Sequence, residues 1–302
     1  MITVLGVMAA LSVCGCSPKF SEFVFFQMTD PQIGFRDKSP GYVHSDSLFA
    51  RAVLAVDFRY RLMFSTIRAK GMIPIPLVII TGDLVNDQRD ALQDSIYRAN
   101  RAKIHFPVYE IPGNHDIRPW TPENHSNYLA LRGYDRFSFR FGGCSFIGID
   151  SNCIVDSSDE DRGGDVKISP SDKAAAAQAE AEQLEWLRKQ LRKAQRCRYI
   201  FVFMHCPVIL KDIDEENNYF NFPKKKRAEY IALFKEYGVD VVFAGHTHMD
   251  YDTTAEGIRF VTAGPVGSPL GRGYSGFELV TVSKDSVNCT FLPPYLPAFM
   301  SK

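Results

Sequence analysis

Five short apolar runs, each followed directly by polar side chains, constrain the fold of this chain more than any other feature. Continuous apolar runs of this length are typical of strands that are buried on both faces of a sheet. Loops that leave the carboxyl ends of parallel strands converge on the ligand site of an α/β fold, so we expect the polar residues to meet. The runs, each with its polar continuation, are residues 23–28 with 29–32, 77–80 with 81–83, 108–111 with 112–116, 199–204 with 205, and 241–243 with 244–248.

The segments between these runs carry helical patterns. The predicted helices cover residues 46–70, 90–103, 178–196 and 223–237. The last of them begins at Pro223 and stops before Gly238, which are residues that favour the start and the end of a helix. Alternation of strands and helices predicts an α/β sandwich, and we expect one domain over residues 23–302.

Three further patterns complete the predicted fold. Residues 136–140 and 144–149, separated by two glycines, predict a hairpin. Residues 151–177 are rich in Asp, Ser and Gly, and they predict a long surface loop. Short strands are expected in the C-terminal part, where they would complete a second sheet, at residues 257–263, 277–283 and 286–292.

Composition excludes several classes of protein. The 302 residues carry 35 Lys and Arg against 35 Asp and Glu, and this zero net charge argues against a protein that coats nucleic acid. A hydrophobic share of 45% excludes wholesale disorder. Seven cysteines are too sparse for a disulfide scaffold. We expect a monomer.

Residues 2–15 form an uncharged apolar run. A membrane-spanning helix needs about 20 apolar residues, so this run fits the core of a signal peptide better than an anchor. Its end, Val13-Cys14-Gly15-Cys16, resembles the bacterial lipobox, although no Lys or Arg precedes the run. The resemblance implies a leader over residues 1–15, a lipidated Cys16, and an exported bacterial lipoprotein that the lipid alone holds to a membrane, in the periplasm or at the cell surface. The alternative is an apolar first strand.

Seven side chains at the predicted strand ends are candidate metal ligands. Carboxylates, imidazoles and amide oxygens without a thiolate suit Mn, Fe or Zn. Seven candidates exceed the four ligands that one zinc ion takes, so the count predicts two ions that share a bridging carboxylate. Two such ions can clamp the attacking and leaving oxygens of a displacement at phosphorus. The candidates are Asp30, Gln32, Asp83, Asn114, His205, His246 and His248.

These residues stand in motifs that resemble those of the calcineurin-like metallophosphoesterases, in the family's order. The resemblance spans roughly residues 23–250. It implies a four-layer α/β/β/α sandwich with a dimetal site at the carboxyl ends of the strands. The matching motifs are Asp30-x-Gln32, Gly82-Asp83, Gly113-Asn114-His115-Asp116, His205 and Gly245-His246-Thr247-His248.

The resemblance also implies a role for each residue. Asp83 would bridge the two metal ions. His115 would be the acid that protonates the leaving oxygen, steered by Asp116. The remaining ligands would divide between the sites, with Asp30, Gln32 and His248 at the first and Asn114, His205 and His246 at the second.

Gln32 departs from the usual family motif, which has a histidine at this position. A glutamine carbonyl is a neutral and weaker ligand than a histidine. Gln32 therefore either binds the first metal ion or contacts one of the metal ligands without binding the ion itself. The Asp-Pro-Gln opening resembles the subgroup named calcineurin-like phosphoesterase domain-containing protein 1, described as Ser/Thr phosphatases. Further matches to this subgroup are residues 137–139 before 142–143, 186–187, 219–221 and 270–272.

Three residues are candidates for substrate binding. Arg272 offers a forked donor for a substrate phosphate. Tyr219 and Asn221 lie in an acidic and aromatic segment, residues 214–222, that we expect to border the site. Asn221 either touches the substrate or caps the helix that begins at Pro223. The basic run at residues 224–227 predicts a solvated helix face.

The sequence therefore predicts a dinuclear phosphatase that hydrolyses phosphate monoesters of small molecules or of Ser/Thr phosphoproteins. Water between two metal ions is a hydroxide near neutral pH, and it would attack phosphorus. One alternative is a phosphodiesterase that acts on cyclic nucleotides or other diesters. The other is a metal-binding lipoprotein without turnover, which would have no use for His115.

Overall fold

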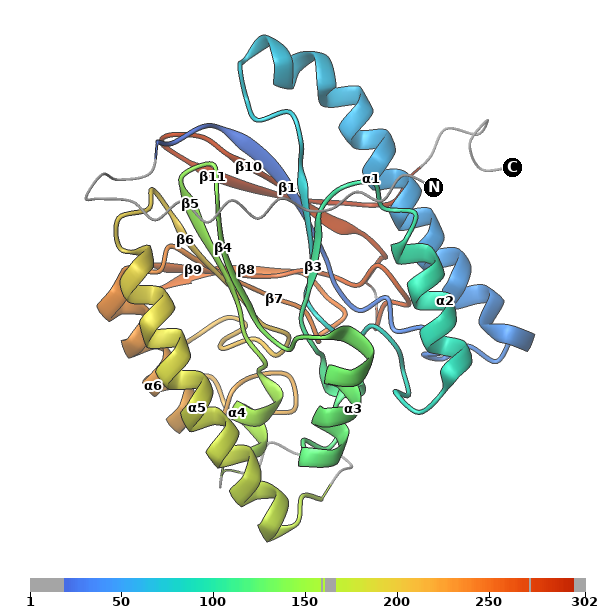
Figure 1. Cartoon of the computed structure of the whole chain (residues 1–302), viewed down its shortest axis with the longest axis vertical. Helices are drawn as coiled ribbons and strands as arrows, with labels where there is room; N and C mark the ends of the chain where they lie inside the picture. Colours follow the sequence, from blue (N-terminus) through green and yellow to red (C-terminus); the bar gives the residue numbers. More distant parts are fainter. Residues whose placement is uncertain (1–18, 159, 161–166, 272, 296–302) are drawn as a thin grey trace.

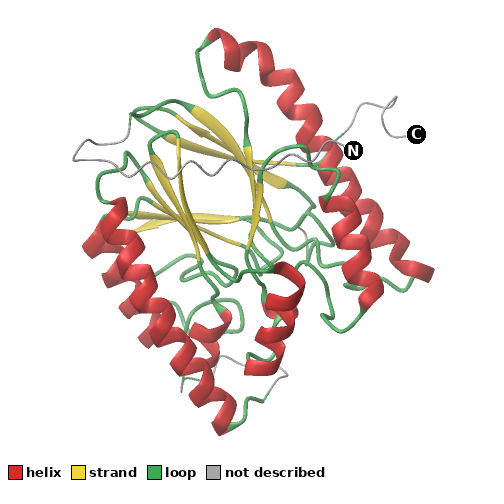
Figure 2. Ribbon diagram, viewed as in Figure 1, coloured by secondary structure: helices red, strands yellow, loops and turns green. Residues whose placement is uncertain are grey.

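A computed structural model describes residues 19–158, 160, 167–271 and 273–295. The predicted leader and Cys16 lie outside this range. Two sheets face each other, and helices cover both outer sides (Figures 1 and 2). This arrangement confirms the predicted four-layer sandwich.

The first sheet has five strands in the order β11-β10-β1-β2-β3. The three strands β1, β2 and β3 are parallel, whereas β10 and β11 extend the sheet in antiparallel fashion beyond β1. The bounds are β1 Phe23–Met28, β2 Leu77–Ile80, β3 Val108–Glu110, β10 Phe277–Val282 and β11 Val287–Leu292.

The second sheet has six strands in the order β4-β5-β6-β7-β9-β8. Its four central strands are parallel, and the two edge strands, β4 and β8, are antiparallel to their neighbours. The bounds are β4 Phe137–Phe141, β5 Cys144–Gly148, β6 Ile200–Phe203, β7 Val241–Ala244, β8 Tyr251–Ala255 and β9 Ile258–Thr262.

The helices lie on opposite sides of the two sheets. Helices α1 and α2 lie together on one side, and α5 and α6 lie on the other (Figure 1). Within the described ranges, none of the helices combines the length and the apolar character that crossing a bilayer requires. The bounds are α1 Val43–Ala69, α2 Ala91–Arg101, α3 Pro122–Arg132, α4 Asn152–Asp156, α5 Pro170–Ala194 and α6 Lys224–Tyr237, with short 3-10 turns η1 Pro40–Tyr42 and η2 Asn114–Asp116.

The space between the sheets is filled largely by phenylalanine rings. Phe25 of β1 is fully buried, and its ring meets Phe146 and Phe243 edge to face at centroid distances of 5.3 and 5.5 Å. Successive side chains of a strand point to opposite faces, so Phe26 instead enters the core beneath the helices. Both faces of β1 are therefore buried, which explains why its sequence is apolar without alternation.

The structure corrects three predictions about the chain's organisation. The segment 151–177 is not one loop, because α4 and the first turns of α5 fall within it. Helix α5 begins at Pro170, where the Ser169 side chain accepts a hydrogen bond from the backbone nitrogen of Asp172. The three C-terminal strands do not complete one sheet, because β9 joins the six-stranded sheet while β10 and β11 join the other.

Helix α3 and strand β8 were not predicted. Strand β8 is an edge strand whose side chains alternate between half-buried and exposed, so it lacks the apolar run that marks a central strand. Helix α3 is capped by Thr121 and has a single fully buried side chain, Tyr128, so its sequence carries little helical periodicity.

Candidate active site

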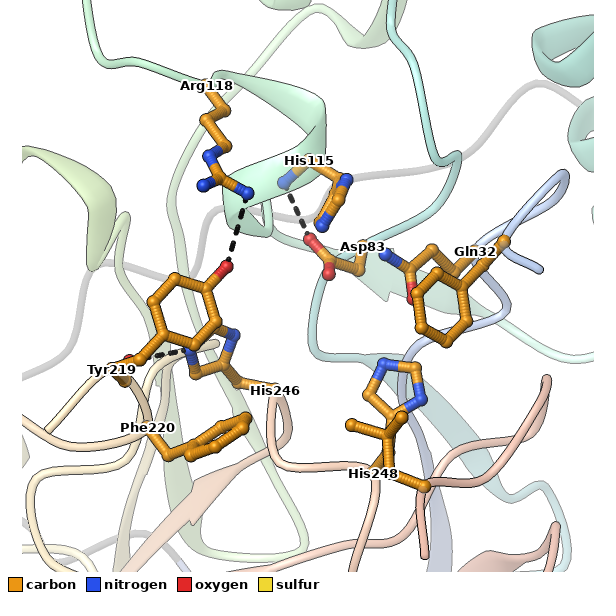
Figure 3. Close-up of a pocket in the computed structure, with 10 residues that line it drawn as sticks. Gln32, Asp83, His115, Arg118, Tyr219, Phe220, His246 and His248 are labelled. Carbon is orange, nitrogen blue, oxygen red and sulfur yellow. Dashed lines mark hydrogen bonds between the residues drawn. The ribbon is translucent and has the colours of Figure 1, made fainter. Parts of the chain in front are cut away.

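The predicted metal ligands meet where the carboxyl ends of both sheets come together. Residues after β1, β2 and β3 approach from the five-stranded sheet, and residues after β6 and β7 approach from the six-stranded sheet. They surround a cavity of about 310 Å³, shown in Figure 3. The cavity is lined by Gln32, Phe35, Asp83, His115, Arg118, Tyr219, Phe220, His246, His248 and Leu270.

The backbone at the candidate ligands adopts an unusual conformation. Left-handed φ angles are uncommon for residues other than glycine, and where they occur they often mark functional sites. The φ angle is 50° at both Asp30 and Asp83, and 73° at His246. Gln32 and His248 share this positive φ. These turns direct five of the seven candidate side chains toward one another immediately after the strands end.

The first group of candidate ligands comprises Asp30, Asp83 and His248, whose ligand atoms all lie within 4.8 Å of one another. Nε2 of His248 is 3.3 Å from Oδ1 of Asp30. Nδ1 of the same ring is 2.6 Å from the carbonyl of Ser268, an arrangement in which Nδ1 carries the proton and Nε2 remains available to a metal ion.

The second group comprises Asp83, His205 and His246. His205 is fully buried, with Nδ1 2.7 Å from the carbonyl of Thr81. Its Nε2 lies 3.3 Å from Oδ1 of Asp83 and 3.1 Å from Oδ1 of Asn114. Asp83 thus belongs to both groups, which is the position that a bridging ligand requires.

Charges in the two groups compensate each other. Burial alone would lower the pKa of His205, but the carboxylates of Asp83 and Asp30 outweigh it and raise this pKa to about 9. Burial would likewise raise the pKa of Asp83, and the surrounding histidines hold it below its usual range instead. Buried carboxylates need a positive partner, and a divalent cation is a stronger one than an imidazolium.

Two buried oxygens support the fit of this donor set to metal ions. Among the described residues, Oδ1 of Asp30 and Oε1 of Gln32 are two of the buried side-chain atoms that accept no hydrogen bond, although Oδ1 of Asp30 lies at the ion-pair distance of 3.3 Å from Nε2 of His248. Leaving a buried polar group unpaired costs about 1–3 kcal/mol. Both oxygens would gain a partner from a metal ion at the first group, so the residues present fit two ions that share Asp83.

The loop after β2 and the loop after β3 approach too closely for side chains at two glycines. A Cβ at Gly113 would collide with the backbone nitrogen of Asp83. Gly82 has a φ angle of 91°, and a Cβ there would lie 2.5 Å from the backbone nitrogen of Gly113. Only glycine at both positions lets these two loops bring Asp83 and Asn114 into one site.

The structure corrects the predicted relation between His115 and Asp116. Nδ1 of the His115 ring is 2.9 Å from the backbone carbonyl of Asn86, so this carbonyl orients the ring. The Asp116 carboxyl instead accepts hydrogen bonds from the backbone nitrogens of Leu84 and Gly113, at 3.0 and 2.8 Å. Asp116 therefore fixes the two loops, and burial together with the nearby Asp83 raises its pKa to about 7.

Of the two predicted substrate residues that the structure describes, Tyr219 lines the cavity and Asn221 does not. The Tyr219 hydroxyl accepts a hydrogen bond of 3.0 Å from Nδ2 of Asn114. Arg272 lies outside the described residues. Asn221 is fully buried, and its amide nitrogen donates to Oε1 of Glu215 and to the carbonyl of Glu216. The prediction that Asn221 touches the substrate or caps a helix is therefore wrong, because its side chain is committed to folding its own loop.

The basic run at residues 224–227 is not wholly a solvated face. Arg227 is 1% exposed, and its guanidinium donates hydrogen bonds to the carbonyls of Ile213, Glu215 and Phe222. The charge of Arg227 thus organises the segment that carries Tyr219 and Phe220. Lys224 and Lys225 are exposed, as predicted.

Sequence reasoning did not single out four residues of the cavity wall, Phe35, Arg118, Phe220 and Leu270, although Phe220 lies in the segment 214–222 that was expected to border the site. Phe35 lies against the His248 ring at a centroid distance of 4.9 Å, and Phe220 lies 5.7 Å from the His246 ring. Arg118 stands two residues after the Gly113–Asp116 motif, and this proximity was the one signal that could have found it. Phe35 carries no signal, since nothing local distinguishes it from a core residue.

The geometry agrees with the comparison of this chain with known protein families. The model of the family described as calcineurin-like phosphoesterase matches residues 59–250. The chain belongs to this family. The match includes every candidate ligand except Asp30 and Gln32, which the structure brings to the same site.

Two curated relatives of this chain share one name, which describes a phosphatase. The rat "Serine/threonine-protein phosphatase CPPED1" is 32% identical over 185 residues, which cover 60% of this chain and 54% of that protein. The zebrafish protein of the same name is 28% identical over 285 residues, 88% of this chain and 82% of that protein. The chain thus spans about half the length of the rat relative.

Solved structures share the fold. A purple acid phosphatase from yellow lupin superposes with a TM-score of 0.60 at 17% identity, over 87% of this chain and 50% of that one. A dimetal phosphatase from zebrafish superposes with a TM-score of 0.59 at 15% identity, over 91% of this chain and 97% of that one. At these identities, the likeness shows the sandwich architecture.

A buried carboxyl behind the site supports the Gly113 loop. Nδ2 of Asn152 donates both to the carbonyl of Gly113, at 3.1 Å, and to Oδ1 of Asp150, at 2.8 Å. Oδ2 of Asp150 accepts a hydrogen bond of 3.1 Å from the Trp120 indole. Burial and the neighbouring Asp135 raise the pKa of Asp150 to about 7.

This raised pKa predicts a pH dependence of stability. Between pH 4 and 7 the folded state holds a proton on Asp150 that the unfolded chain has released, so stability falls as the pH rises, by up to about 1.4 kcal/mol per pH unit. Asp150→Asn should make this slope shallower in urea unfolding by the contribution of Asp150, while Asp116, whose pKa is also raised to about 7, keeps its own contribution. The exposed Asp285→Asn should follow the wild type. An unchanged slope in Asp150→Asn would contradict the prediction.

Proposed function

We propose that this protein is a dinuclear metal-dependent phosphatase that hydrolyses phosphate monoesters. The observation that carries the proposal is the position of Asp83, which lines the cavity and belongs to both groups of buried donors. Family membership and the dimetal phosphatase fold of the zebrafish neighbour support the same chemistry. Oxygen and imidazole donors without a thiolate favour Mn, Fe or Zn.

The donors would divide as the family resemblance implies. Asp30, Gln32 and His248 would hold one ion, Asn114, His205 and His246 would hold the other, and Asp83 would hold both. When bound, the two ions would supply charge to a phosphate and activate a water for attack at phosphorus. The carbonyls of Thr81 and Ser268 orient two of the imidazoles through Nδ1, which fixes the nitrogen that faces the ion.

We assign the role of general acid to His115. Its ring lines the cavity, and the carbonyl of Asn86 accepts the Nδ1 proton. The other nitrogen, Nε2, can then deliver a proton to the leaving oxygen of the ester. The backbone nitrogen of His115 donates to Oδ1 of Asp83 at 2.8 Å, which ties the acid to the bridging ligand.

The substrate class follows from two considerations. The relatives named serine/threonine-protein phosphatases favour a phosphomonoester. The cavity of about 310 Å³ is lined in part by the partly exposed Arg118 and Tyr219, so a phosphorylated side chain or a small phosphomonoester can reach it. A phosphodiesterase is the alternative within the same chemistry, and a metal-binding protein without turnover is the alternative outside it.

We also propose that the protein is an exported lipoprotein that is lipidated at Cys16. The supporting observation is the sequence alone, namely the apolar run at residues 2–15 and the lipobox-like end at Cys16. The substrates of such an enzyme would include phosphomonoesters outside the cytoplasm.

The lipoprotein proposal predicts fatty-acid labelling of one cysteine. In a bacterial host fed an alkyne fatty acid, the wild-type chain should be labelled and should fractionate with membranes. Cys16→Ser should lose both properties, whereas Cys14→Ser, as a matched control, should retain them. Labelling that persists in Cys16→Ser would show that the leader has been assigned wrongly.

The metal proposal predicts the effect of removing the shared carboxylate. The wild type should bind two metal ions, as measured by mass spectrometry, and should hydrolyse nitrophenyl phosphate. Asp83→Asn should bind fewer ions and lose more than about 100-fold in kcat/KM, whereas Asp285→Asn should behave as the wild type. A wild type that binds two ions but hydrolyses neither a monoester nor a diester would exclude the enzyme.

The acid proposal predicts a dependence on the leaving group. His115→Ala keeps its backbone nitrogen and should keep both metal ions. Its kcat should fall by about 10²–10⁴ for an alkyl phosphate, and by much less for nitrophenyl phosphate, whose leaving group needs no proton. Equal losses for both esters would remove His115 from the role of acid.

A further inference from the structure

Arg118 presents a positive charge at the mouth of the cavity. Its backbone carbonyl accepts a hydrogen bond of 3.3 Å from Nδ2 of Asn124, the third residue of the capped start of α3. Its guanidinium lies over the Tyr219 ring, 5.7 Å from the ring centroid, and Nη1 is 3.4 Å from the Tyr219 hydroxyl. Figure 3 shows this guanidinium on the same side of the cavity as His115.

The guanidinium of Arg118 is not paired with a carboxylate of the described residues. Within the described ranges Arg118 forms no ion pair, and its side-chain partner is the neutral Tyr219. By contrast, two arginines elsewhere in the fold lie against acidic groups, Arg101 2.6 Å from Glu110 and Arg132 2.6 Å from Asp94. A half-buried guanidinium held this way beside a cavity is available to an anion that enters it.

The contacts of Tyr219 connect Arg118 to the candidate metal ligands. The Tyr219 hydroxyl receives hydrogen bonds from Asn114, a proposed ligand, and from Arg118. Arg118 and Tyr219 therefore form one polar wall that begins at the ligand set and extends toward the solvent.

We propose that Arg118, positioned by Tyr219, binds a non-bridging oxygen of the substrate phosphate and makes the site selective for phosphate monoesters. The inference rests on the proposed phosphatase function and adds the residue that recognises the substrate class. It assigns the phosphate-binding role to a residue that neither the family motifs nor the sequence patterns indicated.

The chemistry of the two ester classes explains the selectivity. A phosphate monoester has three non-bridging oxygens and carries nearly two negative charges at neutral pH, whereas a diester has two such oxygens and one charge. With two oxygens directed to the ligand set around Asp83, a monoester keeps a third for Arg118. In a diester that position is an ester oxygen with a substituent, which neither carries the charge nor leaves the space that a guanidinium needs.

The test compares kcat/KM of the metal-loaded full chain for nitrophenyl phosphate and bis(nitrophenyl) phosphate. Arg118→Ala should lose about 10- to 100-fold on the monoester, as expected for a hydrogen bond between charged groups, and less than about 3-fold on the diester. Arg118→Lys should recover part of the loss, because lysine supplies the charge without the fork. Arg36→Ala is the matched control, since Arg36 is exposed and lies over the cavity residue Phe35. It should change neither ester.

Equal losses on the two esters in Arg118→Ala would overturn the proposal, because they would show a merely structural role. A second measurement does not depend on turnover. Calorimetric binding of inorganic phosphate should weaken at least about 10-fold in Arg118→Ala and stay unchanged in Arg36→Ala. Unchanged phosphate affinity in Arg118→Ala would likewise overturn the proposal. A wild type that binds phosphate through Arg118 but hydrolyses neither ester would refute the phosphatase function while upholding this site.

Discussion

The buried carboxylates of Asp30 and Asp83 set the conditions for the rest of the structure. A charge in this environment must be compensated, and the fold surrounds the two groups with imidazoles from the opposite sheet. The left-handed turns after the strands bring the imidazoles and the carboxylates close together. The loops after β2 and β3 can also approach each other closely, because Gly82 and Gly113 have no side chains. Each of these features is unfavourable or restrictive by itself, and each shortens the distance between donors that a cation would join.

The sequence predicted the fold wherever a local pattern had one physical cause. Apolar runs marked strands buried on both faces, and the polar residues after them marked the site, because parallel strands deliver their ends to one edge. The pattern failed where the outcome depends on a distant partner. The C-terminal strands carry no signal for which sheet they join, and β10 lies beside β1 although about 250 residues separate them.

The roles of individual side chains were likewise predictable only where a local sequence pattern indicated them. The candidate ligands could be found from their motifs, since a metal site restricts residue type and order. Arg227 was assigned wrongly because charged residues on a presumed helix surface are expected to face water. Asn221 was expected to touch the substrate or to cap a helix, because its burial within its own loop leaves no local signal. Both are buried by the segment between β6 and α6, where Glu215 also accepts hydrogen bonds from the backbone nitrogens of Leu210 and Lys211. Composition does not reveal that the polar side chains of a loop are buried and hydrogen-bonded to the loop itself.

The candidate ligand set is divided between the two sheets. Asp30, Gln32, Asp83 and Asn114 follow strands of the five-stranded sheet, and His205, His246 and His248 follow strands of the six-stranded sheet. Neither half forms a complete coordination sphere for both ions, so the binding energy of the ions becomes available only once the sheets have docked. Cations held in this way would link the two sheets. The association of the sheets would then be stabilised both by the phenylalanine layer between them and by the metal ions at its edge.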